Sequence, residues 1–260
     1  MAQLAVTGAT GNVGRQVLAA FESTDHQLTA ISRTNHEDIH TQLLDVTDRN
    51  RFVELTEGHD ILLHLAANPS PDAEWDAVVG PNIEGTYNAY EAAIRNGLDR
   101  VVFASTNHVV NMYAVGDSAD PESTKDGPIE ALDADTPPLA DSYYGVSKIT
   151  GEALGNLSAH REDIEVVNLR LGWLQSADQL IENVADPAVD TRFAKAMFLS
   201  PRDCRQAILA GTTTELSENP VTANVVSRND ERFLSLTETH QQLGYQPRDN
   251  ASELLEEADS

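Results

Sequence analysis

Apolar residues along the first two thirds of the chain fall into short continuous runs that alternate with stretches of helical spacing. The continuous runs predict strands over 4–8, 27–32, 41–46, 60–67, 99–106 and 165–172. The stretches between them predict helices over 12–22, 48–58, 73–97 and 142–160, with a break or bend of the third near Gly80-Pro81. Strands that are apolar throughout and alternate with helices are typical of a parallel sheet covered on both faces. We therefore predict an α/β fold with a doubly wound parallel sheet.

The remaining third of the chain has a weaker pattern. Residues 113–141 are rich in Pro, Asp and Gly and show no sustained period, which is typical of a functional lid or a disordered segment. After residue 172 the pattern predicts only short helices and one strand at 221–227. We predict a main domain over 1–172, with an active-site loop at 113–141, and a small C-terminal lobe over 173–260.

The charge of the chain narrows the classes of partner. Asp and Glu number 42 against 17 Lys and Arg, a net charge of −25, and only three of the basic residues are lysines. Such a charge excludes nucleic acid and anionic membrane surfaces as partners. It favours a salt-rich cytoplasm, because the Debye length falls to about 3 Å at 1 M salt. An ordinary acidic protein is the alternative.

Targeting, disulfide and metal signals are not evident. The chain has a single cysteine, Cys204, which excludes an intrachain disulfide, and its histidines have no metal-ligand spacing together. No apolar run approaches the length that crosses a bilayer, and no leader pattern is seen. We expect a cytoplasmic protein without a metal.

Three glycines link the first predicted strand to the first predicted helix. The spacing G-x-x-G-x-x-G lets a pyrophosphate approach the backbone and places it at the helix N-terminus. A glycine-rich turn without a ligand is the alternative reading. The place of the glycine motif after a strand and before a helix predicts a Rossmann dinucleotide-binding domain over 1–172. The predicted contacts in this loop are Gly8, Gly11, Asn12, Val13 and Gly14.

The end of the second strand normally decides which dinucleotide is bound. An acidic residue there holds the ribose hydroxyl of NAD, and an arginine accommodates the additional phosphate of NADP. This position reads Ser32-Arg33, so we predict that NADP is preferred and that NAD is possible. The alternative is a solvated Arg33 and binding of both cofactors. The other predicted cofactor contacts are Asp45, Val46, Leu65, Ala66, Ala67, Asn82, Lys148 and Leu174.

A tyrosine and a lysine are candidates for proton transfer. Tyr144 and Lys148 share one face of the predicted helix, whereas Tyr143 is turned away by about 100°. Free tyrosine has a pKa of about 10, and a nearby ammonium together with an oxidised nicotinamide favours the phenolate. Thr106 ends the fifth predicted strand, at the edge where ligands bind in open α/β sheets. Asn107 and His108 follow it as further polar groups.

These motifs resemble the extended short-chain dehydrogenase/reductase family. The resemblance is nearest to its sugar 1-dehydrogenase branch, which includes uronate dehydrogenases and haloarchaeal glucose-6-phosphate and L-arabinose 1-dehydrogenases. It spans nearly the whole chain, through "FASTNH" (103–108), "YGVSK" (144–148), "LRLGWL" (169–174), "AMFLSPRDC" (196–204) and "LGYQPRDN" (243–250). The resemblance implies a catalytic triad of Thr106, Tyr144 and Lys148, a sugar substrate and a homo-oligomer. It also implies substrate contacts at Ser70, Thr106, Asn107, His108, Tyr144 and Trp173.

One departure from this branch bears on the substrate. The relatives that act on anionic sugars carry an arginine where this chain has Phe193, although Arg192 lies one position away, so both are candidate substrate contacts. With Phe193 in place a neutral aldose is favoured. The resemblance therefore implies an NAD(P)-dependent aldose 1-dehydrogenase, with L-arabinose ahead of glucose 6-phosphate and uronates. A nucleotide-sugar epimerase and a non-catalytic NADP-binding protein are the rival classes.

Overall fold

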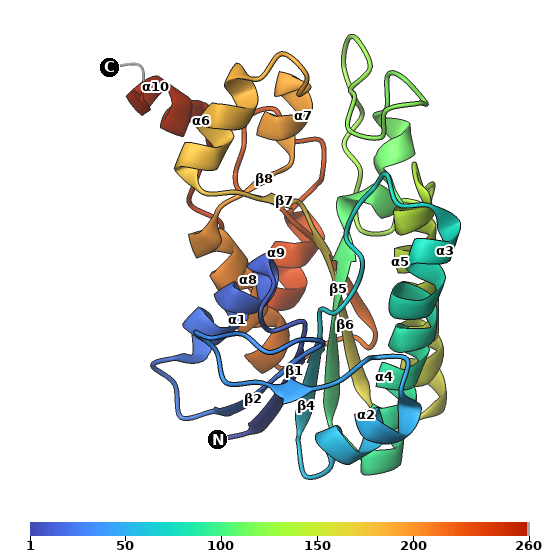
Figure 1. Ribbon diagram of the computed structural model, residues 1–260. Helices are drawn as coiled ribbons and strands as arrows, with labels where there is room; N and C mark the ends of the chain where they lie inside the picture. The colour runs from blue at the N-terminus through green and yellow to red at the C-terminus, as the bar shows by residue number, and fades with distance from the viewer. Residues whose placement is uncertain (259–260) are drawn as a thin grey trace.

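A seven-stranded parallel sheet forms the centre of the computed structural model, which describes residues 1–258 (Figure 1). The strand order is β3-β2-β1-β4-β5-β6-β9, and every pair of neighbours is parallel. The strands are β1 (Gln3–Thr7), β2 (Gln27–Ser32), β3 (Gln42–Leu43), β4 (Ile61–His64), β5 (Arg100–Thr106), β6 (Glu165–Leu171) and β9 (Val221–Val225). The predicted α/β fold is confirmed, although β3 and β4 are shorter than predicted.

Helices cover both faces of this sheet (Figure 1). One face carries α2 (Arg49–Thr56), α4 (Gly85–Asn96) and α5 (Tyr143–Arg161), and the other carries α1 (Asn12–Phe21), α8 (Pro201–Thr213) and α9 (Thr237–Leu243). Alternate residues of a strand point to opposite faces. Leu4 and Val6 of β1 therefore pack with α1 and α8, whereas Ala5 between them packs with α2 and α4. This double burial explains why the strands are apolar throughout.

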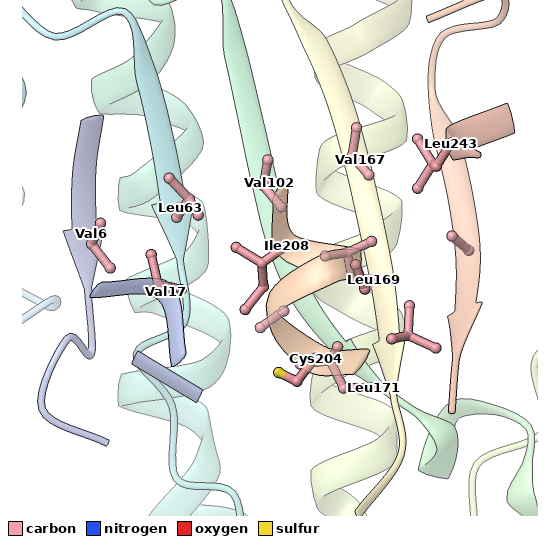
Figure 2. Packing of buried hydrophobic residues seen from close by; sticks show 14 of the residues in the cluster. Val6, Val17, Leu63, Val102, Val167, Leu169, Leu171, Cys204, Ile208 and Leu243 are labelled. Carbon is pink, nitrogen blue, oxygen red and sulfur yellow. The ribbon is translucent and has the colours of Figure 1, made fainter. Parts of the chain in front are cut away.

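The face under α1 and α8 holds the larger of these two clusters (Figure 2). Val17 from α1, and Cys204 and Ile208 from α8, pack on Leu63, Val102, Val167 and Leu169 of the sheet. Cys204 is fully buried, and burial raises the pKa of its thiol to about 12. It is a small core residue on a helix, as its position in the sequence indicates.

The predicted helix 73–97 is divided at the bend. It consists of α3 (Trp75–Val78), a π-helical turn η1 (Val79–Glu84) and α4. Pro81 lies inside η1 and has no backbone N–H to donate, so a regular helix cannot continue through it. The irregular turn carries Asn82 toward the end of β4.

Residues after 172 do not form one separate lobe. Helices α8 and α9 and strand β9 belong to the main sheet and its cover, so the predicted small lobe over 173–260 is too broad. The elements outside the sheet layers are β7 (Trp173–Leu174), α6 (Ala177–Ala185), α7 (Thr191–Ala196), β8 (Phe198–Leu199) and α10 (Ala251–Ala258). They lie together beyond the carboxyl ends of the strands (Figure 1). Within residues 1–258 no helix combines the length and apolar character that crossing a bilayer requires.

The long loop is fixed by its contacts. Two short 3-10 turns, η2 (Asn107–Val109) and η3 (Asn111–Tyr113), lead into it from the end of β5. Leu132 then forms an isolated parallel bridge with Leu234, and its carbonyl accepts from the Asn224 side chain. These contacts hold the loop beside the carboxyl ends of the strands.

Helix α5 lies unusually close to β5. A Cβ atom at Gly151 would lie 2.3 Å from Cζ of Phe103, which is far inside van der Waals contact. The same helix carries Tyr144 and Lys148, and β5 ends at Thr106. The space left by the missing side chain therefore sets the separation of the two elements that carry the candidate chemistry.

We predict that Gly151→Ala lowers the free energy of unfolding by about 1–3 kcal/mol, because the added methyl group overpacks a buried contact. Gly211 in α8 is a matched control, since a Cβ there would lie 3.4 Å from Val167. Gly211→Ala should be neutral or slightly stabilising. Denaturant melts of the two variants and the wild type measure the difference. Equal stability of the two variants would contradict the close packing of α5.

Candidate active site

Two cavities adjoin at the carboxyl ends of the parallel strands. The first, of about 470 Å³, extends from the glycine loop to Tyr144 and Phe193. The second, of about 490 Å³, reaches Ser32 and Arg33. Both are lined by Gly8, Ala66, Ala67 and Pro69, so they form one continuous cleft. Such a crevice at the strand ends is where ligands bind in open α/β sheets.

The glycine loop is shaped to receive a phosphate group. Gly8 has a φ of +69°, and a Cβ there would lie 2.9 Å from the backbone nitrogen of Ala66. A Cβ at Gly14 would lie 2.3 Å from the carbonyl oxygen of Gly8. Helix α1 begins after Gly11 with no side-chain cap and no acidic residue in its first turn. Its N-terminus therefore lines the cleft with its positive end, which fits a pyrophosphate.

The far end of the cleft presents a guanidinium group. Arg33 is exposed, lines the second cavity and forms no salt bridge within residues 1–258. Ser32 is buried, and its hydroxyl lies 2.5 Å from the Thr34 carbonyl oxygen and 3.0 Å from the Thr41 hydroxyl. Asp45 accepts hydrogen bonds from the backbone and hydroxyl of Thr47, which lower the pKa of its carboxyl group. Val46 lines the same cavity.

Asn82 does not line either cavity, so the structure does not bring this predicted cofactor contact to the cleft. Its buried amide accepts from the Asn68 N–H at 2.7 Å and donates to the Asn68 carbonyl at 3.0 Å. It also donates to the Ser147 hydroxyl at 2.9 Å. Asn82 thus ties the segment after β4 to α5. The other predicted cofactor contacts, including Leu65 and Leu174, line the cleft.

Thr106, Tyr144 and Lys148 meet inside the first cavity. The Ser142 side chain caps α5 by accepting from the Gly145 N–H, so Tyr144 is in the first turn of the helix. Tyr144 and Thr106 line the same cavity, and the Thr106 hydroxyl lowers the pKa of the Tyr144 phenol. The Lys148 ammonium donates to the Ala104 carbonyl at 2.6 Å and lies 5.8 Å from the centre of the Tyr144 ring.

The neighbouring tyrosine is in a different environment. Tyr143 is 52% exposed and packs edge-to-face on Trp75, with 5.8 Å between the ring centres. It does not line the first cavity. The helical turn between adjacent residues therefore separates a buried tyrosine from a surface one.

Burial controls the protonation of both buried groups. It lowers the pKa of Lys148 to about 7, against an opposing effect of Glu152. It also raises the pKa of Tyr144 to about 12, although the hydroxyl of Thr106 lowers it. We expected Lys148 to draw the phenol toward its ionised form. Within the protein alone, the cost of burying a phenolate is the larger effect.

A buried ion pair lies beneath Lys148, and sequence reasoning did not find it. Arg170 of β6 donates twice to Glu152 of α5, at 2.9 Å for each bond. Ser105 of β5 donates to the same carboxylate at 2.5 Å. These contacts join two strands to the helix that carries the candidate base. Glu152 raises the pKa of Lys148 against burial, so it favours the ammonium form.

The other end of the first cavity is built from Asn107, His108, Trp173 and Phe193. Phe193 is buried, and its ring centre lies 6.1 Å from that of His108 and 6.2 Å from that of Trp173. Nδ1 of His108 lies 2.7 Å from a carboxylate oxygen of Asp141. The buried amide nitrogen of Asn107 has no hydrogen-bond partner within residues 1–258. It is available to a ligand as a donor.

Two predicted substrate contacts are not in this group. Pro69 and Pro71 line the first cavity, whereas Ser70 between them does not. Arg192 donates to the Lys125 carbonyl oxygen at 2.8 Å, outside the cavity. Helical geometry explains the position of Arg192, because neighbouring residues of α7 point in different directions and Phe193 faces the cavity. Of the described residues that line this cavity, Lys148 is the one lysine or arginine.

Comparison with known proteins identifies similar chains. A sequence model of the NAD dependent epimerase/dehydratase family matches residues 4–200. L-arabinose 1-dehydrogenase (NAD(P)(+)) of Haloferax volcanii is 50% identical over 256 residues, 98% of this chain and 100% of that enzyme. NAD-dependent glucose-6-phosphate dehydrogenase of the same organism is 31% identical, over 98% of this chain and 96% of that enzyme. The solved structure of glucuronic acid dehydrogenase from Chromohalobacter salexigens has a TM-score of 0.79 at 27% identity. The match covers 99% of this chain and 88% of that one.

We predict that Lys148→Met raises the melting temperature at pH 6 more than at pH 10. The pKa of Lys148 in the folded protein is about 7, below its ordinary value of 10.5. Between these values the unfolded chain binds more protons, so wild-type stability rises with pH, and the cost of the buried charge is complete below pH 7. Removing the amine relieves that cost at low pH.

Thermal melts of both proteins across this range measure the effect as a difference, which cancels other titrations. Lys195→Met is the control, because Lys195 is only partly buried and lies near Glu231. A gain from Lys148→Met that is the same at every pH would contradict the buried-charge account.

Proposed function

This chain belongs to the NAD-dependent epimerase/dehydratase family, and we propose that it is an NAD(P)-dependent aldose 1-dehydrogenase. The reaction oxidises the C1 hydroxyl of a pyranose to the aldonolactone, with L-arabinose as the proposed substrate. The observation that carries the proposal is the meeting of Thr106, Tyr144 and Lys148 at one end of a dinucleotide-sized cleft. The 50% identity to an L-arabinose 1-dehydrogenase supports it.

NADP is the proposed preferred cofactor, and NAD is an alternative. The uncapped start of α1 and the close approach of Gly8 to Ala66 fit the pyrophosphate. Arg33 supports the additional phosphate, because its exposed guanidinium has no ion pair with any of residues 1–258 and can bind a phosphate bidentately. The buried hydroxyl of Ser32 stands where a carboxylate would favour the ribose of NAD.

Proton transfer is the proposed task of Tyr144. Its phenolate oxygen accepts the proton of the C1 hydroxyl as the C1 hydride leaves and the carbonyl of the lactone forms. Thr106, which lines the same cavity as the phenol, orients the same hydroxyl. Lys148 supplies positive charge beside the ring. When bound, the oxidised nicotinamide supplies the hydride acceptor and a second positive charge, which favours a phenolate that burial alone disfavours.

A neutral sugar fits the cavity better than an anionic one. The family resemblance places Phe193 where relatives that act on anionic sugars have an arginine. Phe193 lines the cavity, and Arg192 is engaged outside it. The amide of Asn107 and the ring of His108 offer hydrogen bonds without a fixed positive charge. Glucose 6-phosphate and uronates are therefore the second choice. We propose that β7 and α7, which contribute Trp173 and Phe193, form the substrate side of the site.

The rival classes have less support. A nucleotide-sugar epimerase needs room for a nucleotide in its C-terminal part. After β6, however, α8, β9 and α9 are used in the sheet layers, which leaves β7, β8 and three short helices. A binding protein without catalysis has no need for a buried lysine whose charge is disfavoured.

The cellular setting is also proposed. The net charge of −25 and the relative from Haloferax volcanii support a salt-rich cytoplasm. Tyr87 of α4, and Val146 and Leu157 of α5, expose between 40% and 50% of their surface. These apolar side chains on two neighbouring helices support a homo-oligomer.

A substrate panel tests the function. Neutral aldoses, uronates and sugar phosphates are incubated with NADP or NAD in molar KCl, and the reduced cofactor is followed by absorbance. We expect L-arabinose with NADP to give the highest kcat/KM. Net cofactor reduction separates a dehydrogenase from an epimerase, which returns its cofactor to the starting state. Binding of NADP without oxidation of any sugar would contradict the proposal.

Tyr144→Phe should lower kcat by about 10²–10⁴-fold, the contribution of a positioned proton acceptor. The KM for NADP should change little, because the ring and the helix remain. Tyr143→Phe is the matched control on the adjacent, exposed tyrosine, and we expect nearly full activity from it. Retention of substantial activity by Tyr144→Phe would contradict the role of the phenol.

Arg33→Ala should raise the KM for NADP by at least tenfold and leave the KM for NAD nearly unchanged, because only NADP has the phosphate that a charge-assisted bond can hold. Arg161→Ala, at an exposed position at the end of α5, is the control for the loss of one positive charge and should change neither KM. Equal effects on the two cofactors would remove the phosphate role of Arg33.

A further inference from the structure

A carboxylate from the long loop lines the substrate end of the cleft. Glu122 is half-buried and lines the first cavity together with His108, Pro71 and Phe193. No sequence signal distinguishes Glu122, because it lies in a loop with many acidic residues. Only the folded loop separates this carboxylate from its exposed neighbours, such as Glu130.

The backbone around Glu122 is held from several sides. The Asn111 amide donates to the Pro121 carbonyl at 2.7 Å, and the Glu122 N–H donates to Asp120 at 3.0 Å. Two residues later, the Thr124 N–H donates to Asp190, the residue that caps α7, at 2.8 Å. The loop therefore fixes Glu122 relative to the helix that carries Phe193. The backbone that carries Glu122 is therefore pre-organised beside the cavity.

The carboxylate itself is not used by the fold. Its side chain forms no hydrogen bond or salt bridge within residues 1–258, whereas His108 beside it is already engaged by Asp141. Burial raises the pKa of Glu122, with His108 opposing and with Asp72, Asp120 and Asp141 adding to the rise. A partly buried acceptor without a partner is costly unless a ligand supplies donors.

We propose that Glu122 is a specificity-determining residue whose carboxylate accepts hydrogen bonds from hydroxyl groups of a neutral sugar and repels sugars that carry a carboxylate or phosphate. This inference rests on the proposed function. A carboxylate accepts strong, charge-assisted hydrogen bonds from hydroxyl groups. A like charge brought into the same half-buried site is disfavoured, because water screens it less there. Glu122 then favours neutral sugars, whereas the arginine that the family resemblance implies in other relatives favours anionic ones.

The test compares Glu122→Gln with Glu130→Gln on the same loop. In Glu122→Gln, kcat/KM for L-arabinose should fall by about tenfold or more, mainly through KM, because one charge-assisted bond is weakened. For glucuronate and glucose 6-phosphate, kcat/KM should stay constant or rise. Glu130→Gln should change neither value, since Glu130 does not line the cavity. A second variant, Glu122→Arg, should shift the preference further toward the anionic sugars.

The outcomes distinguish the inference from the proposed function. A merely structural role of Glu122 would lower kcat/KM for all sugars by the same factor and lower the melting temperature, which would overturn the inference. Unchanged kinetics in Glu122→Gln would also overturn it while leaving the dehydrogenase intact. If the wild-type protein oxidises neither class of sugar, the proposed function fails and this inference fails with it.

Discussion

Helix α5 can pack closely on β5, on the turn after it and on α4 only because residues 151, 145 and 155 have no side chain. A Cβ at these positions would lie between 2.3 and 2.6 Å from His108, Phe103 and Tyr90. This close approach brings the Tyr144 phenol to Thr106 and the Lys148 ammonium to the carbonyl of Ala104. The site therefore depends on a packing constraint that is set by glycines, to which the bonds of Glu152 with Arg170 and Ser105 are added. Because close-packed interiors relax little, the constraint also fixes the site rigidly.

The same packing has an electrostatic cost. It places Lys148 in a region where its charged form is disfavoured, and it raises the pKa of Tyr144 above the ordinary range. The Glu152–Arg170 pair beneath the site offsets part of this cost, because Glu152 favours a charged Lys148. The protein alone thus favours the neutral phenol of Tyr144. A cation bound beside it would favour the phenolate. In the proposed reaction the oxidised nicotinamide is both this cation and the hydride acceptor. The phenolate is therefore favoured only when the hydride acceptor is bound.

The sequence predicted the elements whose signals are local. Continuous apolar runs located every strand of the main sheet, and the proline in η1 located the bend before α4. Features that depend on contacts distant in the chain were missed. The two-residue strands β7 and β8 have no period, and the return of β9 to the sheet follows from pairing with β6. Position in the sequence predicts Asn82, Ser70 and Arg192 in the cleft. None of them lines its cavities, because Asn82 is bonded to Ser147 and Arg192 to the Lys125 carbonyl, while only the prolines beside Ser70 face the cleft.

Charge acts differently on the surface and in the cleft of this protein. Most of its 42 acidic residues belong to the surface field, which salt at molar concentration screens within a few ångströms. That field cannot discriminate between neutral and anionic sugars under such conditions. Glu122 is half-buried and lines the cavity itself, so its interaction with a ligand at contact distance is screened much less. At molar salt, a charge inside the cleft therefore keeps an effect on a ligand that the surface charges lose, and this difference underlies the role proposed for Glu122.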